Sequence, residues 1–104
     1  IYDKDKRLLV AYDGPKIVGL ISMLLLKRLN QTKLEMYVPE LVVLPKYQRM
    51  GIGKKLVSRC NQLAKKEKCF RIRLESGYSR TASHTFYKKI GFVDYAVTFK
   101  KTLS

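Results

Sequence analysis

The feature that most constrains this chain is the segment LPKYQRMGIGKKL at residues 44–56. It follows the β-branched run ELVV and precedes apolar residues at helical spacing, so it predicts a strand, a glycine turn and a helix in that order. Gly51 and Gly53 stand where the chain enters the helix, and glycine there permits a positive φ and lets a ligand approach the backbone. The first N–H groups of a helix lack internal partners and carry partial positive charge, so the turn is suited to hold an anion.

The remaining pattern predicts an α/β fold with a mixed sheet. Strands are expected at 7–12, 16–26, 33–44 and 70–75, helices at 52–67 and 81–90, and one or two further strands within 91–103. The first three strands form an antiparallel meander. A helix that joins the third strand to the fourth implies a right-handed crossover, and therefore a locally parallel pair. No repeat or linker interrupts the pattern, which predicts a single domain over residues 1–104.

The composition limits the classes of partner. The 104 residues are 46% hydrophobic, which is enough for one packed core, and 22 Lys and Arg against 8 Asp and Glu give a net charge of +14. Such a charge favours a polyanionic partner, such as nucleic acid, an acidic membrane surface or a phosphate-rich small molecule, or simply reflects a solvated basic surface. The aromatic residues do not interleave with the basic ones in an RNA-binding signature, which argues against nucleic acid.

Cysteine and histidine usage argues against a metal site. Cys60, Cys69 and His84 show neither a CxxC spacing nor a cluster, and Cys60 falls on the apolar face of the predicted helix as a buried thiol. Two unpaired cysteines suit a cytoplasmic protein. The longest apolar run, at 17–26, is about half the length needed to cross a bilayer, so no membrane span is expected.

Two nucleotide-binding loops are excluded by the residues of the glycine turn. The sequence contains no GxxxxGK[ST], which excludes the P-loop. The dinucleotide-binding pattern GxGxxG also fails, because Leu56 stands where its third glycine should be. The turn alone leaves open a purely geometric role for its glycines.

Two segments together resemble the signatures of the GNAT family of N-acetyltransferases. The run QRMGIG at 48–53, preceded by ELVVLPKY, is similar to that family's acetyl-CoA-binding motif, and RTASHTFYKKIGF at 80–92 is similar to its second hallmark. The two lie in the family's order and at about its separation, and the resemblance extends over residues 7–100. It implies a mixed, mostly antiparallel central sheet with a splayed parallel strand pair.

The resemblance also implies acetyl-CoA as the acetyl donor, with no metal. In relatives the pantetheine arm pairs with the strand before the loop, which here implies Leu41, Val42 and Val43. The pyrophosphate of relatives sits on N–H groups of the loop, which here implies Gln48, Arg49, Met50, Gly51, Ile52, Gly53 and Lys54.

For the chemistry, the resemblance implies a general acid at Tyr87, which would protonate the departing thiolate. The alternative for Tyr87 is a core aromatic. Many relatives carry a basic or acidic group at the positions of Tyr37 or Pro39, and neither residue here can serve as a carboxylate base. Glu40 is therefore the candidate base and Glu35 the second, while either is also explained as an ordinary ion-paired strand residue.

The implied function is direct transfer of an acetyl group to a primary amine within a ternary complex. The acceptor is a small amine, a protein N-terminus or a lysine, and the charge of +14 disfavours a highly cationic one. Family members open with a strand and two helices, whereas this sequence begins at about the second strand, so a shortened chain or completion by a partner chain, such as a second copy, is expected. The alternative function is a non-catalytic, regulatory acyl-CoA-binding domain.

Overall fold

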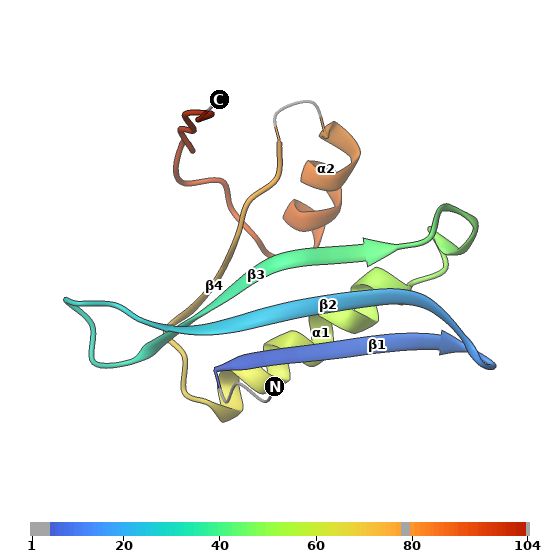
Figure 1. The fold of residues 1–104 in the computed structure, drawn as a ribbon, viewed down its shortest axis with the longest axis horizontal. Helices are drawn as coiled ribbons and strands as arrows, with labels where there is room; N and C mark the ends of the chain where they lie inside the picture. The colour runs from blue at the N-terminus through green and yellow to red at the C-terminus, as the bar shows by residue number, and fades with distance from the viewer. Residues whose placement is uncertain (1–4, 78–79, 104) are drawn as a thin grey trace. The chain divides into compact units, whose positions relative to one another are not determined.

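The computed structural model describes residues 5–77 and 80–103, which fall into two compact units that meet in sequence at Leu74 and Glu75 (Figure 1). The first unit contains β1 (Lys6–Asp13), β2 (Lys16–Lys27), β3 (Leu34–Val43), the 3-10 turn η1 (Pro45–Tyr47), α1 (Ile52–Lys66) and β4 (Arg71–Leu74). The second unit contains α2 (Thr81–Lys89).

The sheet of the first unit has the order β1-β2-β3-β4. The strand pairs β1–β2 and β2–β3 are antiparallel, whereas β3 and β4 are parallel and are joined through α1. The predicted mixed sheet with one parallel pair is therefore confirmed. The parallel ladder is short, running from Glu35↔Arg71 to Val38↔Leu74, and β3 continues to Val43 beyond it. The pairing of β3 with β4 thus ends at Val38.

One face of the sheet packs against α1, and Gly19 of β2 permits the close approach. A Cβ atom at Gly19 would lie 3.2 Å from Cγ2 of Ile52 and 3.2 Å from the backbone oxygen of Val42. From Gly19 to Leu25 alternate residues of β2 share this face and are buried, and Val18 is buried as well. The core comprises Val18, Ile21, Met23, Leu25, Met36, Val38, Leu56, Val57, Cys60 and Ala64. Burial of Cys60, predicted from helical spacing, is confirmed.

Gly19→Ala is expected to destabilise the protein by about 1–2 kcal/mol, because the added methyl group overpacks the contact between β2 and α1. The Val42 oxygen belongs to the backbone and cannot rotate away, unlike the far end of a side chain. Gly77→Ala is the matched control, since no atom of another described residue beyond its chain neighbours lies within 4 Å of a Cβ there. Urea unfolding compares the two variants with the wild type, and equal midpoints for all three would contradict the packing argument.

A β-bulge interrupts the pairing of β2 with β3. Leu24 pairs with Tyr37 and Ser22 with Glu40, so β2 advances two positions while β3 advances three. Val38 and Pro39 of β3 thus stand opposite the single residue Met23 of β2. Pro39 has no N–H to donate to the ladder, which suits it to a bulge. Because of the bulge, Tyr37 and Glu40 lie on the same face of the sheet, the one opposite α1.

The prediction of one or two strands within 91–103 is wrong, because the structure has no strand in residues 92–103. The prediction rested on the alternating apolar residues of this segment. Among them Val93, Tyr95, Val97 and Phe99 are 78%, 60%, 61% and 90% exposed. Alternation indicates which face a strand could bury, but a strand also needs a neighbour to accept its backbone hydrogen bonds.

Candidate functional site

The turn between β3 and α1 adopts a backbone conformation that favours glycine at residue 51. Gly51 is the N-cap of α1 and adopts the left-handed region, with φ 84°, and Arg49 is also left-handed, with φ 65°. A side chain at Gly51 would meet open space, since within residues 5–77 and 80–103 no atom beyond the chain neighbours lies within 4 Å of a Cβ there. The glycine is thus needed for backbone conformation and for access from outside, and not for internal packing.

The N-terminus of α1 is open to an anion. Its first helical hydrogen bond runs from the Lys55 N–H to the Gly51 carbonyl, at 3.0 Å, so the N–H groups of Ile52, Gly53 and Lys54 precede the internal ladder. Among the residues that the structure describes, no side chain caps this end, and the first turn of α1 holds no acidic residue. Exposed Lys54 and Lys55 add positive charge to that of the helix dipole. These groups together favour a diphosphate-sized anion.

Gln48 stabilises the loop through two hydrogen bonds to backbone carbonyls. Its side-chain Nε2 donates to the Val43 carbonyl at 3.0 Å, and its backbone N–H donates to the Pro45 carbonyl at 3.3 Å. Another hydrogen bond connects η1 to the β1–β2 hairpin: the Tyr47 hydroxyl donates to the Asp13 carboxylate at 2.7 Å. The hydrogen bond to Asp13 raises the pKa of Tyr47, so this hydroxyl stays protonated as a donor. These hydrogen bonds therefore hold the loop to the end of β3 and to the end of β1.

The edge of β3 beyond Val38 presents backbone groups. Leu44 donates its N–H to Val18 of β2 at 2.9 Å, and the direction of the backbone groups alternates along a strand. Leu41 and Val43 therefore turn their N–H and C=O groups away from β2, while Val42 turns its own toward β2. Within the first unit β4 pairs with β3 only up to Val38, so this edge is a template for an extended chain.

Glu40, the candidate base, is exposed on the face opposite α1. Tyr37 lies on the same face, and the Arg73 guanidinium is 4.4 Å from the centroid of its ring. Ser22 pairs with Glu40 across β2 and β3, and its buried hydroxyl has no hydrogen-bond partner among residues 5–77 and 80–103. Sequence reasoning missed Ser22, although a polar residue between Leu20 and Leu24 in an apolar run is a readable signal.

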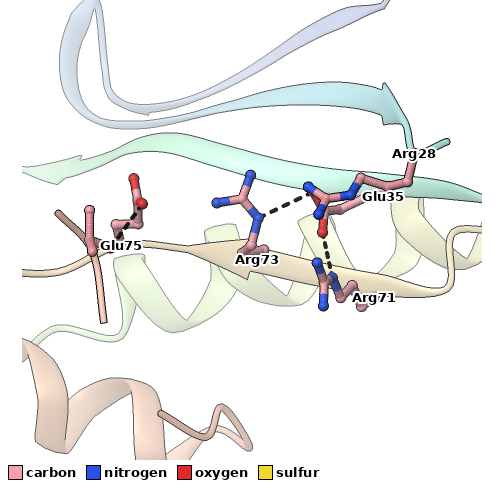
Figure 2. Close-up of polar contacts among 6 residues, drawn as sticks. Arg28, Glu35, Arg71, Arg73 and Glu75 are labelled. Carbon is pink, nitrogen blue, oxygen red and sulfur yellow. Dashed lines mark hydrogen bonds and ion pairs between the residues drawn. The ribbon is translucent and has the colours of Figure 1, made fainter. Parts of the chain in front are cut away.

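Glu35, the second candidate base, lies in a charged cluster on the same face (Figure 2). Its side chain is fully buried and accepts hydrogen bonds from Nε of Arg71 and, at 3.2 Å, from Nε of Arg73. Arg28 Nη1 lies 3.5 Å from Oε1. Burial by itself raises the pKa of Glu35, but the hydrogen bonds and charges of Arg71 and Arg73 outweigh it, so the pKa lies below its usual value. A carboxylate held ionised in this way is a poor proton acceptor.

Glu35→Gln is expected to lower the free energy of unfolding by about 2 kcal/mol at neutral pH, since it removes the charge that three arginines contact. Because the folded-state pKa is lowered, the carboxylate stabilises the fold fully above its unfolded pKa of about 4.5 and loses this contribution as the pH falls through the folded value. The difference between wild type and variant should therefore shrink below pH 4.5. Urea unfolding at neutral and acidic pH tests this, and a difference that does not change with pH contradicts it.

Tyr87, the candidate acid, lies on α2 in the second unit and is partly buried. Its ring makes edge contacts with Phe86 and Phe92, with centroids 5.3 and 5.7 Å apart. Burial raises the pKa of Tyr87, against a smaller opposing effect of Arg80, so the hydroxyl stays protonated at neutral pH. On the same helix, His84 Nε2 lies 2.8 Å from the Gly77 carbonyl oxygen. This hydrogen bond connects α2 to the segment that precedes it, which gives the histidine a structural role.

Two further features of the described residues bear on function. Over 5–77 and 80–103, no three His, Cys, Asp or Glu side chains gather as a metal site would require. None of the helices in these ranges is long and apolar enough to cross a membrane.

Comparison with known proteins assigns the family. Residues 4–94 match the acetyltransferase (GNAT) domain. The chain belongs to the GNAT acetyltransferase family. The match covers the glycine turn, the splayed strand pair and most of the second unit, and it agrees with the resemblance read from QRMGIG and RTASHTFYKKIGF. None of the curated protein sequences compared with this GNAT chain matched it.

Solved structures agree with the family assignment. An aminoglycoside acetyltransferase from an uncultured soil metagenomic sample is 26% identical, with a TM-score of 0.90 over 98% of this chain and 68% of its own. A transcriptional regulator from Bacillus halodurans is 25% identical, with a TM-score of 0.91 over 97% of this chain and 68% of its own. Glucosamine-6-phosphate N-acetyltransferase from Arabidopsis thaliana, 19% identical, has a TM-score of 0.86 over 96% and 68% of the two chains and shows the shared fold.

Proposed function

We propose that this GNAT chain is an acetyl-CoA-dependent N-acetyltransferase that moves the acetyl group directly to a primary amine. The observation that carries the proposal is the uncapped N-terminus of α1, entered through left-handed Gly51 and flanked by Lys54 and Lys55. In the proposal the N–H groups of Ile52, Gly53 and Lys54 hold the diphosphate of acetyl-CoA. Arg49 and Met50 line the approach to these groups, and Gln48 keeps the loop in shape.

The pantetheine arm is proposed to pair with the edge of β3. Leu41 directs its N–H and C=O groups to that edge and Val43 its N–H, while the Val43 carbonyl accepts from Gln48 Nε2, so an amide-containing arm can hydrogen-bond there as an added strand does. Val42, whose backbone faces β2, supplies its half-exposed side chain to the same segment. This arrangement leads from the diphosphate at the loop to the thioester further along β3.

The proposed reaction needs one base and one acid. An ammonium acceptor loses a proton to Glu40, directly or through water, and the neutral amine attacks the thioester carbonyl carbon. In the tetrahedral intermediate the attacking nitrogen carries one proton more than the amide product, and it releases this proton to water. When the intermediate collapses, the C–S bond breaks, the thiolate takes a proton from the Tyr87 hydroxyl, and water returns a proton to the Tyr87 oxygen.

The acceptor is proposed to be an amine-bearing small molecule or protein. Similar structures include an aminoglycoside acetyltransferase and a glucosamine-6-phosphate N-acetyltransferase, whose acceptors are amino sugars by name. With a net charge of +14, this chain repels a polycationic acceptor at long range. A neutral or anionic amine therefore fits better than an aminoglycoside.

A second candidate is a non-catalytic, regulatory acyl-CoA-binding domain. It is favoured by Tyr37 and Pro39 at the positions where many relatives carry the base, and by Arg73 over the Tyr37 ring. One similar structure is a transcriptional regulator by name.

Release of free CoA thiol, measured with acetyl-CoA and a panel of neutral, anionic and cationic amines, separates the two candidates. The transferase produces thiol in proportion to acetylated amine for at least one acceptor. Tight binding of acetyl-CoA without release over the whole panel would favour the regulatory domain.

A further inference from the structure

We propose that Glu35 is a positioning residue that fixes where β3 and β4 separate, and so shapes the edge of β3 that receives the pantetheine arm. This inference rests on the proposed function and adds to it a residue that touches neither cofactor nor acceptor in the scheme above. It concerns how the chain holds the binding edge open, and not the transfer step itself.

The contacts of Glu35 span two positions of β4. Arg71 is its register partner across the parallel pair, and Arg73 is the partner of Tyr37 two residues on. One oxygen, Oε2, bonds Nε of Arg71, and the other, Oε1, bonds Nε of Arg73 at 3.2 Å. A single carboxylate on β3 is therefore tied to both residues of β4 that face it, as Figure 2 shows.

This tie lies directly before the point of separation. The parallel ladder has its last pair at Val38↔Leu74, and the bulge beside Pro39 follows at once on β3. Arg73 is held a second time, over the ring of Tyr37. Parallel pairing is slightly less stable per residue than antiparallel pairing, and β4 has only 4 residues, so its few backbone hydrogen bonds alone fix its register on β3 weakly.

The buried charge makes the register of β4 specific. A slip of β4 by one residue would turn Arg71 and Arg73 to the other face of the sheet and bring Ile72 opposite Glu35. Glu35 would then be a fully buried carboxylate that has lost two of its three arginine contacts and keeps only that of Arg28, which is unfavourable. The carboxylate thus selects one register, and that register sets the residue at which the strands part.

The test compares two ligands in wild type and variants by calorimetric titration. Acetyl-CoA engages both the loop and the edge of β3, whereas adenosine 3′-phosphate 5′-diphosphate has no pantetheine arm and engages the loop only. Glu35→Gln is expected to weaken acetyl-CoA about tenfold, because misplacement of a binding edge by a fraction of an ångström has effects of this order, and to leave the nucleotide within about twofold. Glu67→Gln is the matched control: it removes the same charge from an ion pair with Arg7 at 3.6 Å, and should change neither affinity.

A second variant keeps the test decisive if Glu35→Gln fails to fold. Arg71→Lys retains the positive charge but loses the planar donor group that Glu35 binds, so the same selective loss of acetyl-CoA affinity is expected. An equal loss for both ligands, or no loss for either, overturns the positioning role and leaves the proposed function standing. Wild-type protein that binds neither ligand overturns the proposed function and this inference with it.

Discussion

Gly51→Asp is expected to weaken acetyl-CoA binding at least about 100-fold while the protein stays folded. Aspartate tolerates the left-handed conformation of residue 51 better than most residues, and nothing lies within 4 Å of its Cβ position. A negative charge at the N-terminus of a helix is also favourable, so α1 itself should not be destabilised by it. The loss of binding then has an electrostatic cause, because a carboxylate occupies the end of the helix where the diphosphate is proposed to sit.

The size of this effect follows from the charges. A unit charge about 4 Å from another near a protein surface interacts by roughly 4 kcal/mol, and 1.4 kcal/mol is a tenfold change in affinity. Some of this is screened by salt, which leaves about 100-fold or more. The loss should also become smaller as the salt concentration rises.

Gly51→Asn provides the matched control. Asparagine has the shape and the backbone tolerance of aspartate without its charge, so it should weaken binding only about tenfold, by occupying space. Calorimetric titration of both variants separates charge from bulk. Equal affinities of the Asp and Asn variants would contradict a diphosphate at this helix end.

Tyr87→Phe is expected to lower kcat about 100-fold with little change in the affinity for acetyl-CoA. The lower part of the range for general acid catalysis gives this magnitude, because water can partly replace the lost hydroxyl. Since burial raises the pKa of Tyr87 above its ordinary value of 10.0, the acid remains protonated at neutral pH, and its loss of a proton should not limit the rate there.

The control for this variant removes a hydroxyl from an exposed tyrosine. Tyr12, on β1, is 63% exposed, and Tyr12→Phe should leave kcat unchanged. Steady-state rates of thiol release, together with acetyl-CoA affinities, give the comparison. Unchanged kcat in the Tyr87 variant would show that the ring serves packing against Phe86 and Phe92 and not proton transfer.

Local pattern was sufficient to predict most of the elements of this fold. Apolar spacing indicated α1, and α2 together with Gly91, which follows it with φ 101°, was readable in the same way. The parallel pair followed from the connection through a helix. These features depend on neighbours a few residues apart, and for that reason the sequence contains them.

The features that the sequence did not reveal depend on contacts between distant residues. The bulge beside Pro39 depends on how β3 pairs with β2, and it places Glu40 on the same face as Tyr37. The tie between Glu35 and Arg71 spans 36 residues, and the hydrogen bond from Tyr47 to Asp13 spans 34. Likewise, an alternating apolar pattern in residues 92–103 could not show whether a neighbouring strand exists to pair with.

Calorimetric titration of the wild-type chain can show whether the loop before α1 holds the diphosphate of acetyl-CoA. Acetyl-CoA is compared with S-acetylpantetheine, which carries the same thioester and arm but no nucleotide diphosphate. The account predicts that acetyl-CoA binds at a 1:1 ratio and at least about 100-fold more tightly than S-acetylpantetheine, as a charge-assisted site for two phosphates implies. Equal affinities for the two ligands, or no binding of acetyl-CoA, would contradict it.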